Sequence, residues 1–290
     1  MGNWFRLGNL ELLVVSDGVI RQDAGATFGL VPRVMWERYT PDLDDKNRIP
    51  VGLNSLLIRS EGETILVDTG VGTKPVRAPG AMTIEQSGRL LENLRTEGVS
   101  LNDIDIVINT HLHFDHCGGN TVMEDGVPVP AFPRARYFVS NSEWESATHP
   151  NERTGGTYVL ENFEPLQDSR RVELVTGEAE VAKGVRVLPA PGHTEGHCVI
   201  ELESGGRYGL CVGELSQIPV MMERLAWISA FDVLPLVSLS TKRRMMDWAV
   251  EKRALLHSVH APFPGLGRLV AEEGGRRKWQ EEAKEDGAEL

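Results

Sequence analysis

The sequence predicts a single layered α/β domain, and three observations lead to this prediction. The chain has 290 residues, which suits one layered domain and is short for two. Its 41% hydrophobic and 25% charged residues are typical of a globular protein with a large core. Short apolar runs alternate with turns along the chain, and helical patterns lie between some of them, which favours α/β layers over a helical bundle.

The first half of the chain contains most of the predicted turns. We expect a strand over residues 10–15 that ends at Ser16-Asp17-Gly18, and a strand pair over 54–59 and 64–67. Residues 21–50 are rich in Pro, Gly and charge, which predicts a long loop or lid. Thr83-Ile84-Glu85-Gln86 has the capping-box pattern and predicts the start of a helix that ends at Gly98.

The second half is predicted to be mostly strands. A buried strand over 105–109 is followed by further strands over 135–139, 172–175, 184–188, 199–202 and 208–212. An amphipathic helix is expected over 241–252, and a last strand over 255–259. Residues 276–290 are expected to form a charged tail, helical or frayed, so that one domain spans 1–290.

Charge and cysteine content restrict the partners and the compartment. Forty-two acidic residues against 30 basic ones give a net charge of −12, which disfavours nucleic acid and a polybasic membrane anchor. A small-molecule substrate fits this composition better. Three cysteines are too few for a disulfide framework and indicate a reducing compartment. The sequence shows neither a signal-peptide pattern nor an apolar run of about 18 residues, so we expect a cytoplasmic protein without membrane spans.

The most informative segment is His111-Leu112-His113-Phe114-Asp115-His116, directly after an apolar strand. Neutral imidazoles bind Zn²⁺ well, and a carboxylate adds negative charge to the site. A second motif, Pro191-Gly192-His193-Thr194-Glu195-Gly196-His197, offers His193 as a further ligand at another strand end. We expect His197 to orient neighbouring groups or to pack, rather than to bind metal directly.

These motifs resemble those of the metallo-β-lactamase superfamily, and Leu66-Val67-Asp68-Thr69-Gly70 is similar to its early aspartate motif. The resemblance covers about residues 10–268 and implies a four-layer αββα sandwich with a metal site at the sheet edge. It further implies that His111, His113 and His193 hold one divalent ion, while Asp115, His116 and a late histidine hold a second. Asp68 would orient a ligand. The late histidine is assigned to His260, at a strand end, in preference to His257, within the strand.

The chain departs from the family pattern at Glu214. The family usually has a bridging aspartate there, and glutamate is one methylene longer. Three outcomes are open: Glu214 bridges two ions, Glu214 binds one ion, or one site is weak. Cys211 is the alternative ligand, although a buried packing role suits it better. Zinc is the first expectation for the two ions, but Fe, Mn and Co use the same ligands.

The resemblance also implies an activity. The expected enzyme is a hydrolase that uses a metal-bound hydroxide, with Asp115 as the catalytic proton carrier. Cys117 follows the ligand motif directly, but nothing marks it as a nucleophile. Three segments, residues 231–235, 242–244 and 260–267, are similar to the branch that contains acyl-homoserine lactonases and organophosphate or aryl-ester hydrolases, so a lactone is the first expected substrate. The alternatives are a phosphotriester or aryl-ester hydrolase, a glutathione-thioester hydrolase or persulfide dioxygenase, and a non-enzymatic metal-binding protein.

Candidate substrate contacts come from two apolar segments. One lies within the expected lid over 21–50, which could instead form the interface of a homodimer. The other lies after Glu214. Each residue could equally belong to the core, because large apolar side chains are more often core than pocket lining. The candidates are Phe28, Trp36, Tyr39, Met222 and Trp227.

Overall fold

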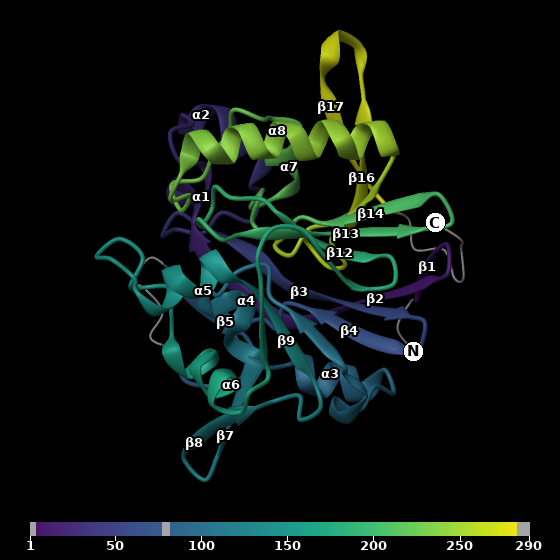
Figure 1. The fold of residues 1–290 in the computed structure, drawn as a ribbon. Coiled ribbons are helices and arrows are strands. Elements are labelled where there is room, and N and C mark those ends of the chain that lie inside the picture. The colour runs from purple at the N-terminus through teal and green to yellow at the C-terminus, as the bar shows by residue number, and fades with distance from the viewer. Residues whose placement is uncertain (1–3, 77–81, 283–290) are drawn as a thin grey trace.

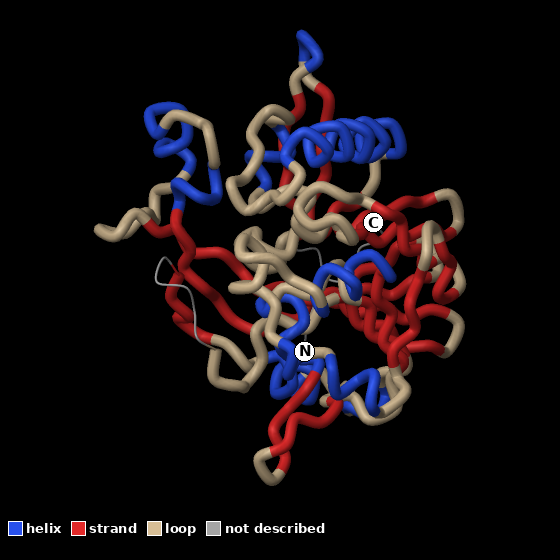
Figure 2. Tube along the Cα trace, turned by 60° about the vertical axis from the view of Figure 1, so that its left-hand side comes forward, coloured by secondary structure: helices blue, strands red, loops and turns tan. Residues whose placement is uncertain are grey.

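The computed structural model describes residues 4–76 and 82–282 of the chain. Two β-sheets lie face to face, and helices cover the outer face of each (Figure 1). Turned by 60°, the trace shows strands between helices at the top and at the bottom of the view (Figure 2). This is the αββα sandwich that the resemblance implies, and no helix of the described residues is long and apolar enough to cross a membrane.

The first sheet contains eight strands in the order β1-β2-β3-β4-β6-β9-β10, with β5 paired to β2. Their bounds are β1 Phe5–Leu7, β2 Leu10–Asp23, β3 Arg48–Ser60, β4 Glu63–Val67, β5 Met82–Gln86, β6 Ile106–Ile108, β9 Arg136–Ser140 and β10 Val172–Val175. Strands β7 (Thr121–Glu124) and β8 (Val127–Pro130) form a separate hairpin.

The second sheet contains seven strands that pair in sequence order. Their bounds are β11 Ala179–Ala182, β12 Val185–Pro189, β13 Cys198–Ser204, β14 Arg207–Cys211, β15 Leu255–His257, β16 Leu266–Ala271 and β17 Arg277–Glu281. The helices are α1 Ala24–Phe28, α2 Arg33–Trp36, α3 Leu90–Thr96, α4 Phe114–Cys117, α5 Asn141–Thr148, α6 Glu164–Asp168, α7 Pro219–Glu223 and α8 Pro235–Lys252. Short 3-10 turns lie at Glu37–Tyr39, Leu101–Asp103, Gly118–Asn120, Leu160–Asn162 and Glu273–Gly275.

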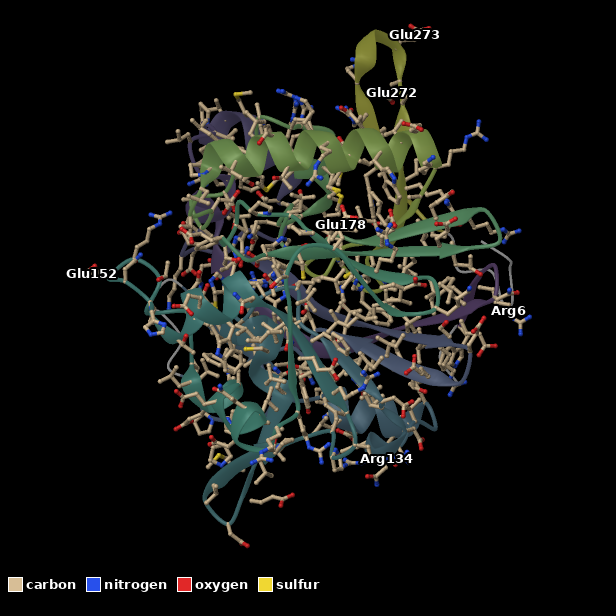
Figure 3. All side chains as sticks on the ribbon, viewed as in Figure 1. Arg6, Arg134, Glu152, Glu178, Glu272 and Glu273 are labelled. Atoms are coloured by element: carbon tan, nitrogen blue, oxygen red, sulfur yellow. The ribbon has the colours of Figure 1, made fainter. Side chains whose placement is uncertain are left out.

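The central strands are apolar on both faces, as a four-layer arrangement requires. In β4, Ile65 and Val67 point into the core between the sheets, while Leu66 points toward the helices on the outer face. In β15, Leu255 belongs to the same central core and Leu256 packs beneath α8. Because side chains alternate along a strand, continuous apolar runs are what strands buried on two faces need. The charged side chains labelled in Figure 3 lie at the periphery: Arg6, Arg134, Glu152, Glu178, Glu272 and Glu273.

Strand direction brings the predicted ligands to one edge. Strand β4 runs parallel to β6, and β14 runs parallel to β15. Loops that leave the carboxyl ends of such strands meet at the same edge, which is where open α/β sheets place their sites. The loop after β6 carries His111 and His113, the loop after β14 carries Glu214, and the loop after β15 carries His260.

Three predicted elements were wrong. Residues 83–86 belong to strand β5, which pairs with β2, and helix α3 starts only at Leu90. The local capping pattern was overridden by pairing across the sheet. Residues 21–50 are no free loop, because β2 continues to Asp23 past a bulge near Gly18 and β3 begins at Arg48. Residues 277–281 form strand β17 rather than a tail, while residues 283–290 lie outside the described part of the chain.

Candidate metal centre

The ligand loop is held by close backbone packing. Helix α4 begins just after His113 and carries Asp115 and His116. A side chain at Gly118 would lie 2.1 Å from the carbonyl oxygen of Val71, so only glycine lets the loop after α4 approach the loop after β4 this closely. Lys74, buried on that loop, donates to the carbonyl oxygens of Gly118 and Thr121 at 2.6 and 2.7 Å and thereby ties the two loops together.

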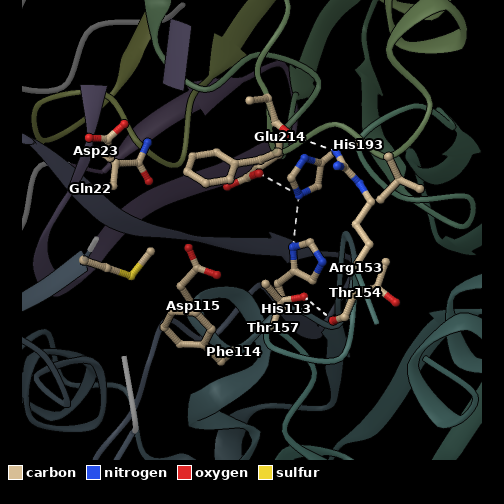
Figure 4. Close-up of a pocket in the computed structure, with 14 residues that line it drawn as sticks. Gln22, Asp23, His113, Phe114, Asp115, Arg153, Thr154, Thr157, His193 and Glu214 are labelled. Atoms are coloured by element: carbon tan, nitrogen blue, oxygen red, sulfur yellow. Dashed lines mark hydrogen bonds and ion pairs between the residues drawn. The ribbon is translucent and has the colours of Figure 1, made fainter. Parts of the chain in front are cut away.

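Two groups of buried side chains offer ligand atoms to a metal ion. In each group the atoms all lie within 4.8 Å of one another. Glu214 belongs to both groups, and Figure 4 shows it beside His193 at the centre of the site. The first group is His111, His113, His193 and Glu214, and the second is Asp115, His116, Glu214 and His260.

The geometry fits metal ions better than direct contacts between the side chains. Ligand atoms at 2.0–2.1 Å from a tetrahedral ion lie roughly 3.3–3.4 Å apart. Nδ1 of His113 lies 3.0 Å from Nε2 of His193, and the Nε2 atoms of His116 and His260 lie 3.3 Å apart. Nε2 of His111 is buried without a partner. A buried polar atom without a partner is costly, and one cation in each ligand group would satisfy these nitrogens.

The charge of the site also calls for cations. Four carboxylates are buried here, and in the described residues every ion pair that they form is with a histidine. Two divalent ions would supply counter-charge to these four carboxylates. Buried carboxylates without such compensation would be strongly destabilising. They are Asp68, Asp115, Glu214 and Asp232.

Glu214 spans the two groups through its two oxygens. Oε1 lies 2.7 Å from Nε2 of His260, and Oε2 lies 2.7 Å from Nε2 of His193. The backbone N–H of Glu214 donates to Nε2 of His197 at 3.0 Å. Gly213 before it has φ of +51°, and a side chain there would lie 2.6 Å from the His197 ring. The turn at Gly213 therefore requires glycine, and it brings the backbone of Glu214 against the His197 ring.

The direction of the pKa shift differs among the histidines of the site. Burial and the neighbouring imidazoles hold the pKa of His111 and His113 well below the ordinary value, so both are neutral, as metal ligands must be. For His193, burial is outweighed by Glu214 and Asp232, which raise its pKa to about 10. Against burial, Asp68 and Glu214 likewise raise the pKa of His116. Carboxylates that attract a proton so strongly attract a divalent cation in the same way.

Neighbouring groups hydrogen-bond to the ring nitrogens of the ligand histidines that face away from the site. Asp68 accepts from the backbone N–H of Thr110 at 2.8 Å, and its Oδ2 lies 2.8 Å from Nδ1 of His116. This leaves Nε2 of His116 free to face the second ligand group. Nδ1 of His260 lies 2.8 Å from the carbonyl oxygen of Gly52. Such contacts select the tautomer in which the other ring nitrogen can bind metal.

Comparison with known proteins agrees with this geometry. The family model described as "Metallo-beta-lactamase superfamily" matches residues 48–222. The chain belongs to the metallo-β-lactamase superfamily. With its ligand set at the sheet edge, this member of the superfamily is a metal-dependent hydrolase.

Its relatives include several lactonases. An N-acyl homoserine lactonase, AiiA, from Bacillus thuringiensis subsp. kurstaki is 28% identical over 217 residues, covering 70% of this chain and 79% of AiiA. A probable metal-dependent hydrolase from Staphylococcus aureus superposes with a TM-score of 0.86 at 23% identity, covering 95% and 98% of the two chains. AidC, a dizinc quorum-quenching lactonase solved with a product, superposes with a TM-score of 0.80 at 23% identity, covering 97% of each chain.

A pocket of about 220 Å³ opens over the metallo-β-lactamase centre (Figure 4). Gln22 and Asp23 lie on one side of it, and Arg153 and Thr154 lie on the other. Arg153 donates to the carbonyl oxygen of Ala230 at 2.9 Å and so joins two loops at the rim. The wall of the pocket is mainly apolar, and its apolar lining residues are Met82, Phe114, Ala230, Phe231 and Val233.

The five apolar residues predicted from sequence to contact substrate do not line this pocket. Phe28 stacks on Trp36 at a centroid distance of 4.8 Å, and Trp227 packs against both Phe28 and Tyr39. Met222 lies in the core beneath α8. The alternative interpretation, that these side chains are core, is what the structure shows for four of them, while Tyr39 lines a separate cavity beside α7 and β17.

The alternative ligands lie outside the two groups. His257 is in strand β15, and its Nδ1 lies 3.2 Å from Sγ of Cys211, in the core between the sheets. Cys211 therefore packs against His257 and does not approach Glu214. Burial raises the pKa of the Cys117 thiol, which disfavours the thiolate that a nucleophile would need.

Sequence reasoning missed two supporting carboxylates. Oδ1 of Asp232 lies 3.2 Å from Nδ1 of His193. Glu143, on α5, accepts from the backbone N–H of Leu112 and from the hydroxyl groups of Tyr158 and Thr194. It thus joins the two ligand loops. The available signal was weak: Asp232 is a single charge in an apolar stretch, where a buried charge is rare unless paired.

Proposed function

We propose that this protein hydrolyses lactones that carry an apolar substituent, with two divalent ions, zinc first, in the centre described above. The observation that carries the proposal is the position of Glu214. Its carboxylate joins two ligand groups at the floor of a mainly apolar pocket. The names of the relatives, N-acyl homoserine lactonases at 28% identity, support a lactone over other esters.

Each ion would have its own set of ligand residues. His111, His113 and His193 would hold one ion, Asp115, His116 and His260 would hold the other, and Glu214 would contact both. Such a pair of ions lowers the pKa of a bound water and polarises a carbonyl oxygen. The mixed imidazole and carboxylate set suits zinc, and Fe, Mn and Co accept the same donors.

Asp115 is placed to handle the proton. Its side chain lines the pocket, and its Oδ2 lies 3.7 Å from Nε2 of His260. When water adds to the lactone carbonyl carbon and the ring C–O bond breaks, one proton must leave the water and one must reach the ring oxygen. The Asp115 carboxylate can accept the first proton and deliver it to the second position. The product is the open hydroxy acid.

The pocket wall indicates how the substrate lies. Phe114 and Phe231 offer apolar contact beside the ligands, whereas Thr154 and Thr157 offer hydrogen bonds. Asp23 and Arg153, on opposite sides of the pocket, carry opposite charges. A neutral ring with an apolar chain and an amide matches this surface, because pockets of this kind combine apolar area with a few placed polar groups.

The test is a substrate panel on the zinc-loaded protein. It contains N-acyl homoserine lactones of increasing chain length, an aryl ester and a phosphotriester, with His113→Ala as the control for metal-dependent turnover. We expect kcat/KM for the best lactone to exceed that for the other classes at least tenfold, and His113→Ala to lose it. Faster turnover of the aryl ester or phosphotriester, or lactone turnover that survives in His113→Ala, would overturn the proposal.

A further inference from the structure

A chain of buried polar side chains leads away from the shared carboxylate. Nε2 of Gln217 donates to Oε2 of Glu214 at 2.5 Å. Oε1 of Gln217 accepts from Nε2 of Gln22 at 3.2 Å, and the same Gln22 nitrogen donates to Oγ1 of Thr27 at 3.0 Å. Gln22, Thr27 and Gln217 are each at most 2% exposed. None of these three residues is a predicted metal ligand.

The direction of each hydrogen bond in this series of side chains is defined. The hydroxyl of Thr27 donates to the carbonyl oxygen of Asp23, so its oxygen can accept from Gln22. The amide nitrogen of Gln22 supplies both of its hydrogens, one to Thr27 and one to Gln217. Because Gln217 must accept through its oxygen, its amide nitrogen is left facing Glu214. A backbone carbonyl at the end of β2 thus fixes the amide that contacts the shared carboxylate.

The contact with Gln217 restricts a side chain that is otherwise flexible, that of Glu214. A glutamate has one more rotatable bond than an aspartate, so its carboxylate loses more freedom when it is held in one place. The backbone of Glu214 is fixed by His197, but that bond leaves the side chain free. Among the described residues, the other side-chain contacts of Glu214 are imidazoles of the ligand groups, and Gln217 is the contact from outside them.

We propose that Gln217 is a positioning residue that holds the Glu214 carboxylate across both ligand groups, and that Gln22 fixes the Gln217 amide for this purpose. The inference rests on the two-ion centre proposed above. It explains how a longer carboxylate can occupy the shared position: the added methylene is compensated by an added hydrogen bond. The competing explanation is that the two glutamines only fill space between β2 and the loop after β14.

The experiment measures how tightly the weaker of two Zn²⁺ ions is held, by competition with a chromophoric chelator. The four proteins are the parent, Gln217→Met, Glu214→Asp and the double variant. Removing a residue that orients a ligand typically weakens metal binding about 10–100-fold. We expect Gln217→Met to fall in this range when Glu214 is present. Aspartate is too short to reach Gln217, so in the Glu214→Asp background the same change should cost less than about threefold.

Gln22→Met is the matched variant for the relay, since it leaves the Gln217 amide in place but removes its fixed partner. We expect a weakening in the same direction and smaller than that of Gln217→Met. A urea unfolding curve for each variant confirms a folded chain. If Gln217→Met does not fold, Gln217→Asn retains the amide in a side chain too short to reach Glu214 and should give the same loss.

Two other results have distinct meanings. An equal loss on Gln217→Met in the parent background and in the Glu214→Asp background would show that Gln217 only packs, and would overturn this inference. A parent that binds two ions but is unaffected by Gln217→Met would also overturn it. A parent that binds fewer than two ions per chain would instead remove the proposed two-ion centre itself.

Discussion

Nε2 of His197 accepts a hydrogen bond at 3.0 Å from the backbone N–H of Glu214, and Nδ1 of the same ring lies 3.0 Å from the carbonyl oxygen of Ala190. The ring therefore connects the loop that carries His193 to the loop that carries Glu214. Burial lowers the pKa of His197 to about 4, which keeps the ring neutral and able to accept. His197 thus supports the centre without joining either ligand group.

Removing this acceptor should loosen the shared ligand. In His197→Phe the ring remains, but the buried N–H of Glu214 has no partner, which costs about 1–3 kcal/mol. We expect the protein to retain less than two ions per chain after gel filtration and to lose activity about 10–100-fold. His257→Phe is the control, because His257 is equally buried but contacts neither ligand group. Equal metal loss in both variants would contradict this role for His197.

Metal binding should be sensitive to loss of the Asp68 charge alone. Its Oδ2 accepts from Nδ1 of His116, which keeps Nε2 of that ring unprotonated for metal. In Asp68→Asn, an amide N–H directed at Nδ1 would favour the opposite tautomer, with the proton on the ligating nitrogen. We therefore expect Asp68→Asn to lose metal from the second group at least as severely as Asp68→Ala. Metal content measured by mass spectrometry decides, and near-normal content in Asp68→Asn would contradict the tautomer argument.

The pocket assignment distinguishes two phenylalanines. Phe231 lines the pocket, whereas Phe28 is fully buried beneath Trp36. We expect Phe231→Ala to raise KM for long-chain lactones more than for short ones, with a small change in unfolding free energy. Phe28→Ala should instead lower the unfolding free energy by about 3–5 kcal/mol and leave KM nearly unchanged. Kinetics and urea unfolding on the same two variants test this, and a chain-length effect in Phe28→Ala would argue against it.

Acid should destabilise the fold through His257. Burial lowers its pKa to about 4 in the folded protein, against about 6.5 in an unfolded chain. Between these values the unfolded chain binds more protons, so the stability is fully present above about pH 6.5 and falls as the pH drops toward 4. In metal-free protein, His257→Leu should show a shallower dependence of unfolding free energy on pH. His149→Leu, at an exposed histidine, should match the parent. An unchanged slope in His257→Leu would refute the assignment.

Removal of metal should destabilise the folded chain as well as abolish turnover. The buried carboxylates would lose their counter-charge, and an ion at 100 times its Kd contributes about 2.7 kcal/mol per site. We expect a chelator to lower the melting temperature, and Zn²⁺ added in excess of the chelator to restore it. A melting temperature that does not respond to the chelator would mean that these side chains fold without bound ions.

Much of the fold follows from local sequence. The strands next to the ligands were predicted because each is a short apolar run that is buried on both faces, as in β6 and β15. The predictions failed where pairing with another strand decides the structure. Strand β5 is held by β2, which lies far earlier in the chain, and β17 is held by β16. Neither pairing can be predicted from the residues of β5 or β17 alone.

The ligands and their supports differ in the same way. His111, His113, Asp115 and His116 lie in one contiguous motif, so their chemistry is visible in the sequence. Gln22, Glu143, Gln217 and Asp232 reach the centre from four separate elements as single polar residues. The apolar residues of 21–50 were visible as well, but composition does not distinguish a pocket wall from a core. In the structure, Phe28 and Trp36 are core.

The most direct test of the account is the number of metal ions per chain in the parent and in Glu214→Ala, after purification with Zn²⁺ and removal of loosely bound ions. We predict about two ions in the parent and at most one in Glu214→Ala, because both ligand groups use this carboxylate. Two ions in both proteins would contradict the shared role of Glu214, and a parent value near zero would contradict the metal centre as a whole.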